Sequence, residues 1–379
     1  MKLRFLSDIK KSGNSCKPFE GERTYIDTGS VQWDSIVSGE QCTYEKKPSR
    51  ANICADVGDV LFAKMQGSIK VLEITRENVD HIYSTGFYCF KDKRIMPSYM
   101  KYLFLSPIFN TLKDNKSHGS TMSSVNDDNI KRIVIDVPEI TEQAEVVKQL
   151  DTITQAINCQ KRILHLLDEL IESGFIEMFG DPIDNPYEWE MKELGTECDI
   201  ITGNTPSRKI ESYYGDYIEW IKSDNINTPS ALLTQAKECL SEEGLKVGRS
   251  VDEGAILMTC IAGSKKCIGN VAIADRKVSF NQQINAIVPN NNSTWFLYVL
   301  FILAKETIQA PISMSLKGII SKGKLSKMRF IFPPYDLQKE YENYVKEVLR
   351  YKEQATMKLE YYYELLNIKM DELFAAEVQ

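Results

Sequence analysis

Several short loops of this chain are rich in basic and amide side chains. The sequence from Thr202 to Lys209, Thr-Gly-Asn-Thr-Pro-Ser-Arg-Lys, is small, polar and basic, and its backbone donors are expected to be exposed. Lysine and arginine hold phosphate groups, while asparagine, glutamine, serine, threonine and arginine can reach the edges of bases. Such loops suit DNA binding. For any one of them alone, a solvated surface loop is the more common explanation.

The candidate DNA-binding residues lie in both halves of the chain. Because such loops recur at matching places, DNA binding is favoured over a set of unrelated surface loops. The candidates of the first half are Lys64, Gln66, Ser68, Lys70, Lys116, Ser117, His118 and Ser120. The candidates of the second half are Asn204, Thr205, Ser207, Arg208, Lys209, Lys222, Asn225, Ser264, Lys265, Lys266, Lys317, Lys322 and Lys324.

The sequence offers no complete catalytic motif. It lacks the GxxxxGK[ST] phosphate loop, the GxSxG turn and the HExxH metal motif. Pro333-Pro334-Tyr335 matches the Pro-Pro-Tyr with which amino-methyltransferases hold a flipped base, but in those enzymes the preceding residue is Asp, Asn or Ser. Here it is Phe332, which cannot bond the target amine, and no Gly-rich turn for S-adenosylmethionine precedes it. The two prolines are better explained as the entry of a helix.

The chain repeats itself at a distance of about 195 residues. Pro138 and Gln143 correspond to Pro333 and Gln338 at a shift of 195, and Gly58-Asp59-Val60-Leu61 lies opposite Gly254-Ala255-Ile256-Leu257 at a shift of 196. A solenoid has a much shorter period, of roughly 20–50 residues. The repeat therefore indicates a duplicated unit, made of a domain and a helix, that serves two like ligands or partners.

Each copy ends in a long amphipathic segment. Apolar residues in 141–179 recur at steps of 3, 4 or 7, as in a coiled coil, and Gly174 is the only glycine. A helix of this length extends over roughly 55–60 Å. A second such helix is predicted from about 336 to 376. Two helices of matching length are expected to pair as an antiparallel coiled coil. The alternative is that each packs on its own domain, as shorter globular helices do.

The predicted fold class is α+β, with two similar mixed α/β domains joined by two long antiparallel coiled-coil helices in a pseudo-two-fold arrangement. The domains are predicted at 1–138 and 182–334, and the helices at 139–181 and 335–379. Within the first domain, β-branched runs at 57–62, 69–74 and 133–137 predict strands, and 99–113 predicts one helix.

Composition limits the class of protein. A net charge of −7 argues against a simple nucleic-acid binder, unless positive charge is concentrated locally or partners supply it. Nine cysteines without a CxxC pair fit a reducing cytosol, and three widely spaced histidines predict no metal site. The N-terminus becomes charged too early for a signal peptide. The longest apolar run, 295–304, is too short for a membrane span and predicts a buried helix. A cytoplasmic protein without membrane contact is expected.

A set of short sequences in a fixed order resembles a known family. The run Gly203–Ser207, followed by Tyr217–Ile221, resembles the opening of a target recognition domain. The pattern is completed by Gly254-Ala255-Ile256-Leu257, Gly269-Asn270-Val271-Ala272, Phe280-Asn281-Gln282-Gln283, and Pro333-Pro334 with Gln338. The family is the DNA-specificity subunit of type I restriction–modification systems. The resemblance covers almost the whole chain, and the first half, which lacks the G-x-T-P sequence, is the less typical one.

The resemblance implies a chain without catalytic activity or cofactor of its own. Each target recognition domain would read one half of a split double-stranded DNA target in the major groove, and the helices would fix the spacer. Two methyltransferase subunits would bind S-adenosylmethionine and methylate adenine. Restriction subunits, which are motor–nucleases using ATP and Mg, would cut unmodified DNA in bacterial defence. The main alternative is a catalytic DNA adenine methyltransferase or a methylase–nuclease fragment, and a third is a coiled-coil adaptor that binds no nucleic acid.

This interpretation assigns different roles to individual residues. Arg208, Lys222 and Lys265 are expected to affect recognition of one half-site only, whereas Lys324 is expected to contact a phosphate. Adding or removing a heptad within 149–172 should change the spacer and leave the half-site sequences unchanged. The loops that differ between the two copies should carry specificity, so the two half-sites should differ.

Overall fold

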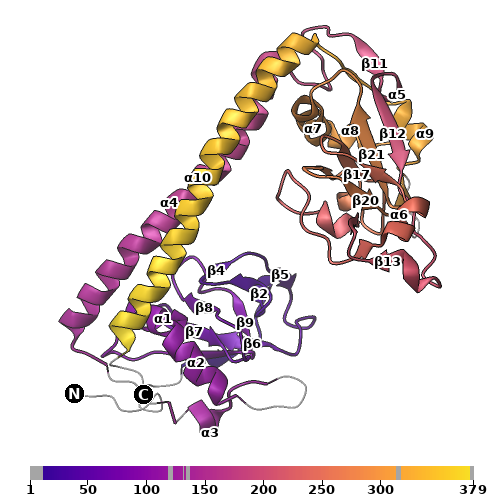
Figure 1. The fold of residues 1–379 in the computed structure, drawn as a ribbon. Coiled ribbons are helices and arrows are strands. Elements are labelled where there is room, and N and C mark those ends of the chain that lie inside the picture. Colours follow the sequence, from indigo (N-terminus) through magenta and orange to yellow (C-terminus); the bar gives the residue numbers. More distant parts are fainter. Residues whose placement is uncertain (1–11, 118–122, 131, 134–136, 313–316, 376–379) are drawn as a thin grey trace. The chain divides into compact units, whose positions relative to one another are not determined.

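The structure, a computed structural model, describes residues 12–117, 123–130, 132–133, 137–312 and 317–375 (Figure 1). The chain divides into two compact units, Met1–Arg162 with Thr356–Gln379, and Ile163–Ala355. The sequence-based division treats each long helix as a segment of its own. Each compact unit instead contains part of both helices, α4 (Ile140–Phe179) and α10 (Tyr335–Phe374).

The first unit contains a five-stranded mixed sheet and a three-stranded antiparallel sheet. The five-stranded sheet has the order β1 (Asn14–Ser15), β6 (Ala51–Cys54), β9 (Ile82–Ser84), β2 (Arg23–Ile26) and β5 (Glu40–Cys42). The three-stranded sheet has the order β10 (Phe87–Phe90), β7 (Val60–Ala63) and β8 (Val71–Glu73). A hairpin and three short helices complete the unit: β3 (Val31–Gln32), β4 (Ser35–Ile36), α1 (Pro97–Leu105), α2 (Pro107–Asn115) and α3 (Asp127–Ile130).

The second unit contains a corresponding pair of sheets. Its five-stranded sheet has the order β13 (Tyr214–Gly215), β15 (Cys239–Leu240), β14 (Ile218–Ile221), β20 (Val278–Phe280) and β16 (Ser250–Val251). Its four-stranded sheet has the order β12 (Cys198–Thr202), β21 (Ile284–Pro289), β17 (Ile256–Thr259) and β19 (Val271–Ile273). Two strand pairs are β11 (Met191–Glu193) with β23 (Arg329–Ile331), and β18 (Ile261–Ala262) with β22 (Gly318–Ile319). The short helices are α5 (Leu194–Glu197), η2 (Glu211–Tyr213), η3 (Ser223–Asn225), α6 (Glu242–Val247), η4 (Lys265–Cys267), α7 (Thr294–Leu303), α8 (Lys305–Gln309) and α9 (Lys322–Ser326).

The two units share one scaffold. In each five-stranded sheet one central pair of strands is parallel, with Ile26 opposite Tyr83 in the first unit and Ile221 opposite Phe280 in the second. In each unit an antiparallel sheet is followed by two consecutive helices, α1 and α2 or α7 and α8. The predicted duplication of a mixed α/β domain is confirmed.

One predicted helix of the first unit is broken. The segment 99–113 was expected to form a single helix, but α1 ends at Leu105 and α2 begins at Pro107. Proline cannot donate the backbone hydrogen bond that would continue α1. Ser106 instead caps α2, since its Oγ accepts from the Phe109 N–H at 3.3 Å. The predicted strand at 57–62 overlaps β7 and that at 69–74 contains β8, while residues 134–136 of the third lie outside the described residues.

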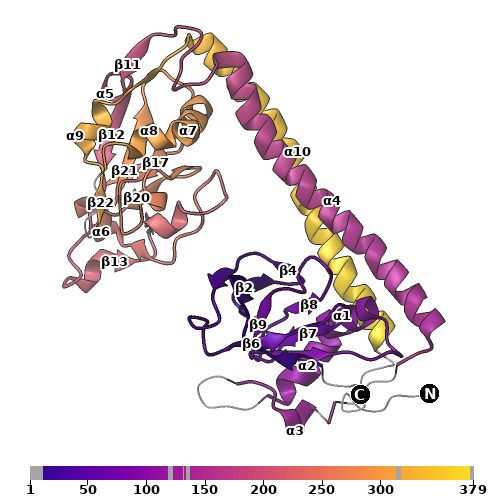
Figure 2. The ribbon, with the colours of Figure 1, turned by 180° about the vertical axis from the view of Figure 1, so that it is seen from behind.

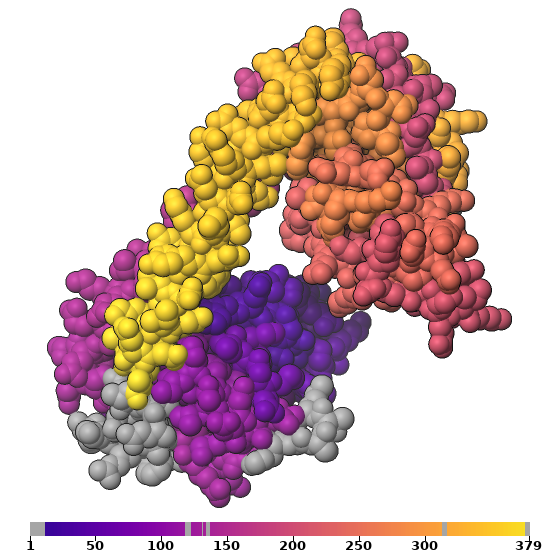
Figure 3. Space-filling view, viewed as in Figure 1, coloured from indigo at the N-terminus to yellow at the C-terminus, as the bar shows by residue number. Residues whose placement is uncertain are grey.

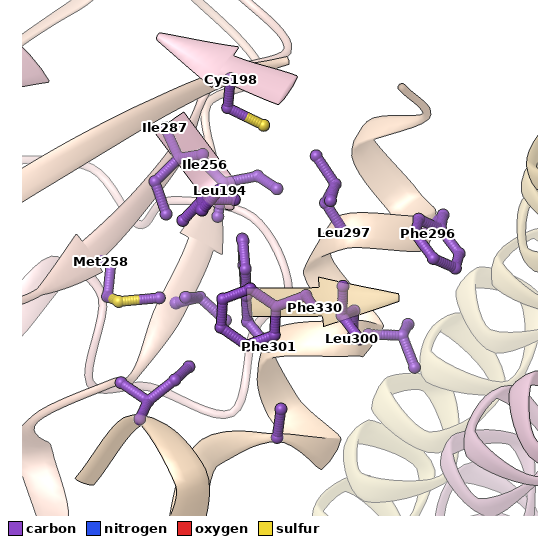
Figure 4. Close-up of a cluster of buried hydrophobic side chains, with 14 of the residues drawn as sticks. Leu194, Cys198, Ile256, Met258, Ile287, Phe296, Leu297, Leu300, Phe301 and Phe330 are labelled. Atoms are coloured by element: carbon purple, nitrogen blue, oxygen red, sulfur yellow. The ribbon is translucent and has the colours of Figure 1, made fainter. Parts of the chain in front are cut away.

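The core of the second unit lies between its four-stranded sheet and α7 (Figure 4). This helix corresponds to the apolar run for which burial was predicted, and Phe296, Leu297, Leu300 and Phe301 are fully buried. Figure 4 shows Leu297 and Phe301 on the side of β17 and β21, whereas Phe296 lies toward the long helices and stacks on Phe175 of α4. Among the described residues, no helix is both long and apolar enough to cross a membrane.

Helices α4 and α10 run side by side in opposite directions (Figures 1 and 2). In the first unit, Leu150 of α4 and Leu366 of α10 belong to one core. In the second unit, the Tyr341 hydroxyl of α10 donates to the Ile171 carbonyl of α4 at 2.7 Å. The early part of each helix thus packs on the late part of the other, and the predicted antiparallel coiled coil is confirmed.

Gly174 allows a close approach between the two helices. It lies against the Tyr344 ring of α10, where an added Cβ would come within 2.5 Å of a ring carbon. The Tyr344 hydroxyl donates to the Leu170 carbonyl at 3.0 Å, one turn earlier on α4. A larger residue at 174 would displace this ring, so the single glycine of the helix is a packing requirement.

A buried glutamine attaches α10 to the domain that precedes it. Gln338 is 1% exposed, and its Oε1 accepts from the N–H of Ser293, the N-cap of α7, at 3.0 Å. Its Nε2 donates to the Pro333 carbonyl at 2.9 Å and to Asn292 Oδ1 at 3.0 Å. Because α10 begins at Tyr335, the prolines do precede a helix, as predicted.

Gln143 forms the same junction in the first unit. It accepts from the N–H of Met96, the N-cap of α1, at 2.8 Å, and it donates to the carbonyls of Pro138 and Arg94 at 2.9 Å each. The proline and glutamine that recur in the sequence are therefore the two ends of one hydrogen-bonded junction.

Replacing Gln338 with alanine should destabilise the chain by about 2–4 kcal/mol, because the Ser293 N–H and the Pro333 carbonyl would remain buried without partners. Gln143→Ala should cost a similar amount. Urea unfolding of the full chain, followed by circular dichroism, measures both. The matched control is Gln155→Ala, on the exposed surface of α4, which should change stability by less than about 0.5 kcal/mol. Equal stability of the Gln338 and Gln155 variants would contradict the junction role.

Candidate nucleic-acid interface

An arginine and a lysine share one carboxylate on the surface of the second unit. Arg208 Nη2 donates to Glu238 Oε2 at 2.6 Å, and Lys222 Nζ donates to Glu238 Oε1. The guanidinium lies 4.7 Å from the ring centroid of Tyr214 and 5.2 Å from that of Trp220. The Lys222 ammonium also lies 5.2 Å from the Trp220 ring. These five residues are called the Arg208–Glu238 cluster below.

The cluster carries two positive charges and one negative charge at neutral pH. The hydrogen bond from Lys222, supported by that from Arg208, holds the pKa of Glu238 below its usual value although partial burial acts to raise it. The side chains are 56% exposed at Arg208, 32% at Lys222 and 36% at Glu238. An exposed site with surplus positive charge suits a polyanion, and the aromatic rings restrict the guanidinium by stacking.

Backbone pairing between β14 and the start of β15 positions the cluster. The Trp220 N–H donates to the carbonyl of Glu238, the residue before β15, at 3.0 Å, so Glu238 lies beside β14. Trp220 Nε1 donates to the Asn204 carbonyl at 3.3 Å, and the Tyr214 hydroxyl donates to the Pro206 carbonyl at 2.7 Å. These bonds hold the 203–210 loop, which carries the arginine of the cluster, against the sheet.

The other candidates of this loop differ in exposure. Thr205, Ser207 and Lys209 are exposed, and the Thr205 hydroxyl donates to the exposed side chain of Gln282. Gln282 was not among the predicted DNA-binding residues. It does belong to Phe280–Gln283, one of the short sequences on which the family resemblance rests. Two loops far apart in the chain thus present polar side chains at one place.

The side chains of two asparagine candidates form hydrogen bonds within the domain. Asn204 Nδ2 donates to the Val247 carbonyl at 2.8 Å. Asn225 is 7% exposed; its Oδ1 accepts from the Lys222 N–H at 3.0 Å, and its Nδ2 donates to the Gln235 carbonyl at 3.0 Å. Both amides therefore stabilise the loops that carry the cluster, and their contact with DNA stays a prediction.

A second basic surface is formed by short elements of the same unit. β18 pairs with β22, with Ala262 opposite Gly318, which brings Lys317 next to the loop that follows β18. That loop carries Ser264, Lys265 and Lys266, and all four candidates are exposed. The remaining candidates, Lys322 and Lys324, are exposed on α9, which packs against α5 and β12.

In the first unit, the lysines of the β7–β8 loop bond to backbone carbonyls. Lys64 Nζ donates to the Thr85 carbonyl at 2.9 Å and lies 4.2 Å from the Tyr88 ring centroid. Lys70 Nζ donates to the Thr28 carbonyl at 2.5 Å. The exposed candidate of this loop is Gln66, and Ser68 is half-buried.

This loop and its counterpart are held in the same way. The buried Lys113 of α2 donates to the Ser68 carbonyl at 2.5 Å, and burial lowers the pKa of this lysine. In the second unit Gln309 of α8 donates to the carbonyls of Lys265 and Ile268 at 2.9 and 2.7 Å. Lys113 and Gln309 stand 196 positions apart, which is the shift of the sequence repeat.

The last candidates of the first unit lie at the end of α2. Lys116 is the C-cap residue, and its carbonyl accepts from Asn129 at 2.9 Å. The Ser117 hydroxyl donates to the Lys113 carbonyl at 2.9 Å. His118 and Ser120 lie outside the described residues.

Glu238, Trp220 and Tyr214 were not predicted as site residues. Glu238 is acidic and stands 30 residues from Arg208, so their contact arises only in the folded domain. Trp220 could have been found from the sequence, because it belongs to Tyr217–Ile221, one of the short sequences on which the family resemblance rests. Within the described part of the chain, no three His, Cys, Asp or Glu side chains lie together as metal ligands.

A duplicated mixed α/β domain with basic and aromatic loops, followed in each copy by a long helix, defines a two-domain DNA-recognition protein. The model of the type I restriction modification DNA specificity domain matches residues 3–169 and 186–361. The chain therefore belongs to this family, the specificity subunits of type I restriction–modification systems, which recognise DNA and are generally non-catalytic.

Individual relatives agree with this assignment. The HindI specificity subunit of Haemophilus influenzae is 20% identical over 355 residues, covering 73% of this chain and 76% of that protein. The putative MjaX specificity subunit of Methanocaldococcus jannaschii is 24% identical over 309 residues, covering 75% and 69%. A chain from a solved structure on complex assembly and conformational transition of the type I R-M system has the same fold, with a TM-score of 0.60, 20% identity, and coverage of 99% and 97%.

Replacing Lys324 with alanine should weaken binding to all DNA sequences alike. It should also make the salt dependence shallower, reducing the magnitude of the negative slope of log affinity against log salt by about one. Fluorescence anisotropy titrations of the chain with its modification subunits, on target and random duplexes at several salt concentrations, measure both effects. Lys148→Ala, on the exposed surface of α4, is the control and should leave the slope unchanged. A changed sequence preference in the Lys324 variant would instead indicate base contact.

Proposed function

We propose that the two domains read the two halves of a bipartite double-stranded DNA target, each in the major groove. The observation that carries the proposal is a shared scaffold with different side chains at one position. The scaffold itself corresponds closely. Trp220 of β14 pairs with Glu238, and Tyr25 of β2, the corresponding parallel-paired strand of the first unit, stands opposite Glu40.

The residue that follows each of these strands has opposite charge in the two units. Lys222 follows β14 and bonds to Glu238. Asp27 follows β2, and its Oδ1 accepts from the N–H and the hydroxyl of Ser30 at 2.7 and 2.8 Å. An aspartate and a lysine at one position of the scaffold present different groups to base edges. The two half-sites of the target therefore differ in sequence.

The long helices set the spacer between the half-sites in this proposal. Half-site separation needs a rigid element between two reading domains. α4 and α10 pass through both compact units without a break, and they pack on each other within each unit. The spacer should therefore depend on the number of helical turns.

The same helices are the proposed docking surface for partner subunits. They keep large apolar side chains in the open: Leu166 is 48% and Leu170 44% exposed on α4, and Met357 is 64% and Tyr361 59% exposed on α10. Figure 3 shows α10 with an uncovered face. Apolar residues exposed together mark protein contacts. We assign them to two methyltransferase subunits, which bring S-adenosylmethionine for adenine methylation, with restriction subunits using ATP and Mg added to the complex.

A catalytic methyltransferase within this chain is the less favoured function. Phe332, which stands where such enzymes have a polar residue, is 6% exposed and belongs to the core of the second unit. A phenyl ring in that position has no hydrogen-bonding group for a base amine.

Mapping methylated adenines in cells that carry this chain with its methyltransferase subunits tests the proposal. The expected result is one bipartite motif with two different half-sites and a fixed spacer. Methylation without such a motif would refute it. Binding of S-adenosylmethionine by the isolated chain, measured by calorimetry, would instead support the catalytic alternative.

Inserting one heptad in both helices, after Arg162 and after Ala355, should lengthen the spacer and leave both half-site sequences unchanged, because the two insertions preserve the pairing of the antiparallel helices. The methylated motif of the variant is the readout. The control is an insertion in α4 alone, which shifts the helices out of register and should reduce methylation of every site. A changed half-site with the original spacer would contradict the role of the helices.

The double substitution Leu166→Asp and Leu170→Asp should weaken assembly with a methyltransferase subunit at least 10-fold, since two apolar contacts of about 1.5–3 kcal/mol each are lost. Calorimetric titration of the chain with that subunit measures the effect. Glu169→Ala, between them and also exposed, is the control and should leave the affinity near that of the wild type. Unchanged affinity of the double variant would assign docking to another surface.

A further inference from the structure

We propose that the Arg208–Glu238 cluster reads one G·C base pair of the second half-site, with Arg208 on guanine and Glu238 on cytosine. The inference rests on the proposed function, since it requires that the second domain faces the major groove. It adds the identity of a base pair and assigns a reading role to an acidic residue.

The hydrogen-bonding groups of the cluster match one base pair. In the major groove a G·C pair presents, in a row, the guanine N7 acceptor, the guanine O6 acceptor and the cytosine N4 donor. Its complement is two donors followed by an acceptor. A guanidinium hydrogen-bonded to a carboxylate at 2.6 Å has this order. An A·T pair presents acceptor, donor and acceptor, and so opposes the cluster at two of three positions.

The guanidinium is already held in place in the free protein. Its bond to Glu238 uses Nη2, and the rings of Tyr214 and Trp220 lie beside it. The end-on edge of the fork consists of Nη1 and the second N–H of Nη2, which can donate to two neighbouring acceptors. A planar fork held on one side can meet the two acceptors of guanine with little loss of conformational freedom.

Lys222 offsets the negative charge of Glu238, so that this acidic residue can lie at a DNA-binding surface. An uncompensated carboxylate would be repelled by the phosphates. Here Lys222 bonds to Oε1 while Arg208 bonds to Oε2, so each oxygen of Glu238 has a cation and the cluster keeps a positive charge. A carboxylate oxygen has more than one lone pair, so Glu238 can still accept from cytosine N4.

The fold does not require this ion pair. The charged groups are 32–56% exposed, and ion pairs of such exposure contribute little to stability. The sheet is already held by the backbone bond from Trp220, and the loop by the bonds to Asn204 and Pro206. A recognition role accounts for the placement of three charged side chains around one tryptophan.

Two conservative substitutions test the inference in the complete complex of chain and methyltransferase subunits. Arg208→Lys keeps the charge but loses the fork, and Glu238→Gln keeps the shape but adds a donor that can bond thymine O4. Methylation of a duplex library, randomised over both half-sites, measures preference at every base pair. Both variants should lose roughly 10- to 100-fold discrimination at one and the same G·C pair of one half-site. The control is Glu253→Gln, an exposed carboxylate in the turn before β17, which should change no position.

The outcomes separate this inference from the proposed function. A wild-type complex without a bipartite motif refutes the proposed function itself. A wild-type motif that both variants leave unchanged, that they alter at two different base pairs, or that has A·T at the affected position overturns the G·C assignment alone. Thermal unfolding of each variant chain should match the wild type, because the altered groups are exposed. A variant that lowers methylation at all sequences equally would make the cluster a phosphate contact and overturn the inference.

Discussion

The architecture depends on one buried amide at the start of each long helix. Gln143 and Gln338 each accept from the N-cap of a domain helix and donate to the proline carbonyl five residues earlier. A side chain that both donates and accepts is required, and it must be uncharged because the site is dry. Leucine would leave the N-cap donor unpaired, and glutamate would bury a charge. The direction in which each helix leaves its domain is thereby determined by hydrogen bonds rather than by apolar packing alone.

Beyond this junction, the two units share their main backbone elements, whereas their exposed side chains differ. The parallel strand pair, the antiparallel sheet and the paired helices recur in both units and are held by backbone bonds and buried side chains. Side chains at the exposed strand ends take no part in those bonds. Lys222 in one unit and Asp27 in the other can therefore occupy the same position on the scaffold without altering it.

Sequence patterns predicted what depends on local spacing. Apolar steps of 3, 4 and 7 predicted α4 and α10, and the repeated Pro and Gln marked the junction, because neighbours on a helix are near in the chain. The Arg208–Glu238 contact could not be predicted in this way, since it joins a loop residue to a residue 30 positions later, just before β15. The hydrogen bonds of Lys64 and Lys70 to backbone carbonyls could not be predicted either. Every residue has a backbone carbonyl, and the sequence does not show which one a lysine side chain contacts. The break before Pro107 was visible in the sequence, and the single-helix prediction gave that proline too little weight.

The composition of the first unit has a consequence for synthesis on the ribosome. Its core includes Leu366, Met370 and Phe374 of α10, and the Phe374 ring packs on Tyr99 at 5.4 Å. The second unit, in contrast, is one continuous segment. During translation the unit encoded second can therefore complete its core first. The unit encoded first keeps an open apolar face until residues 356–374 emerge, and over that interval it is the part of the nascent chain most exposed to chaperones and proteases.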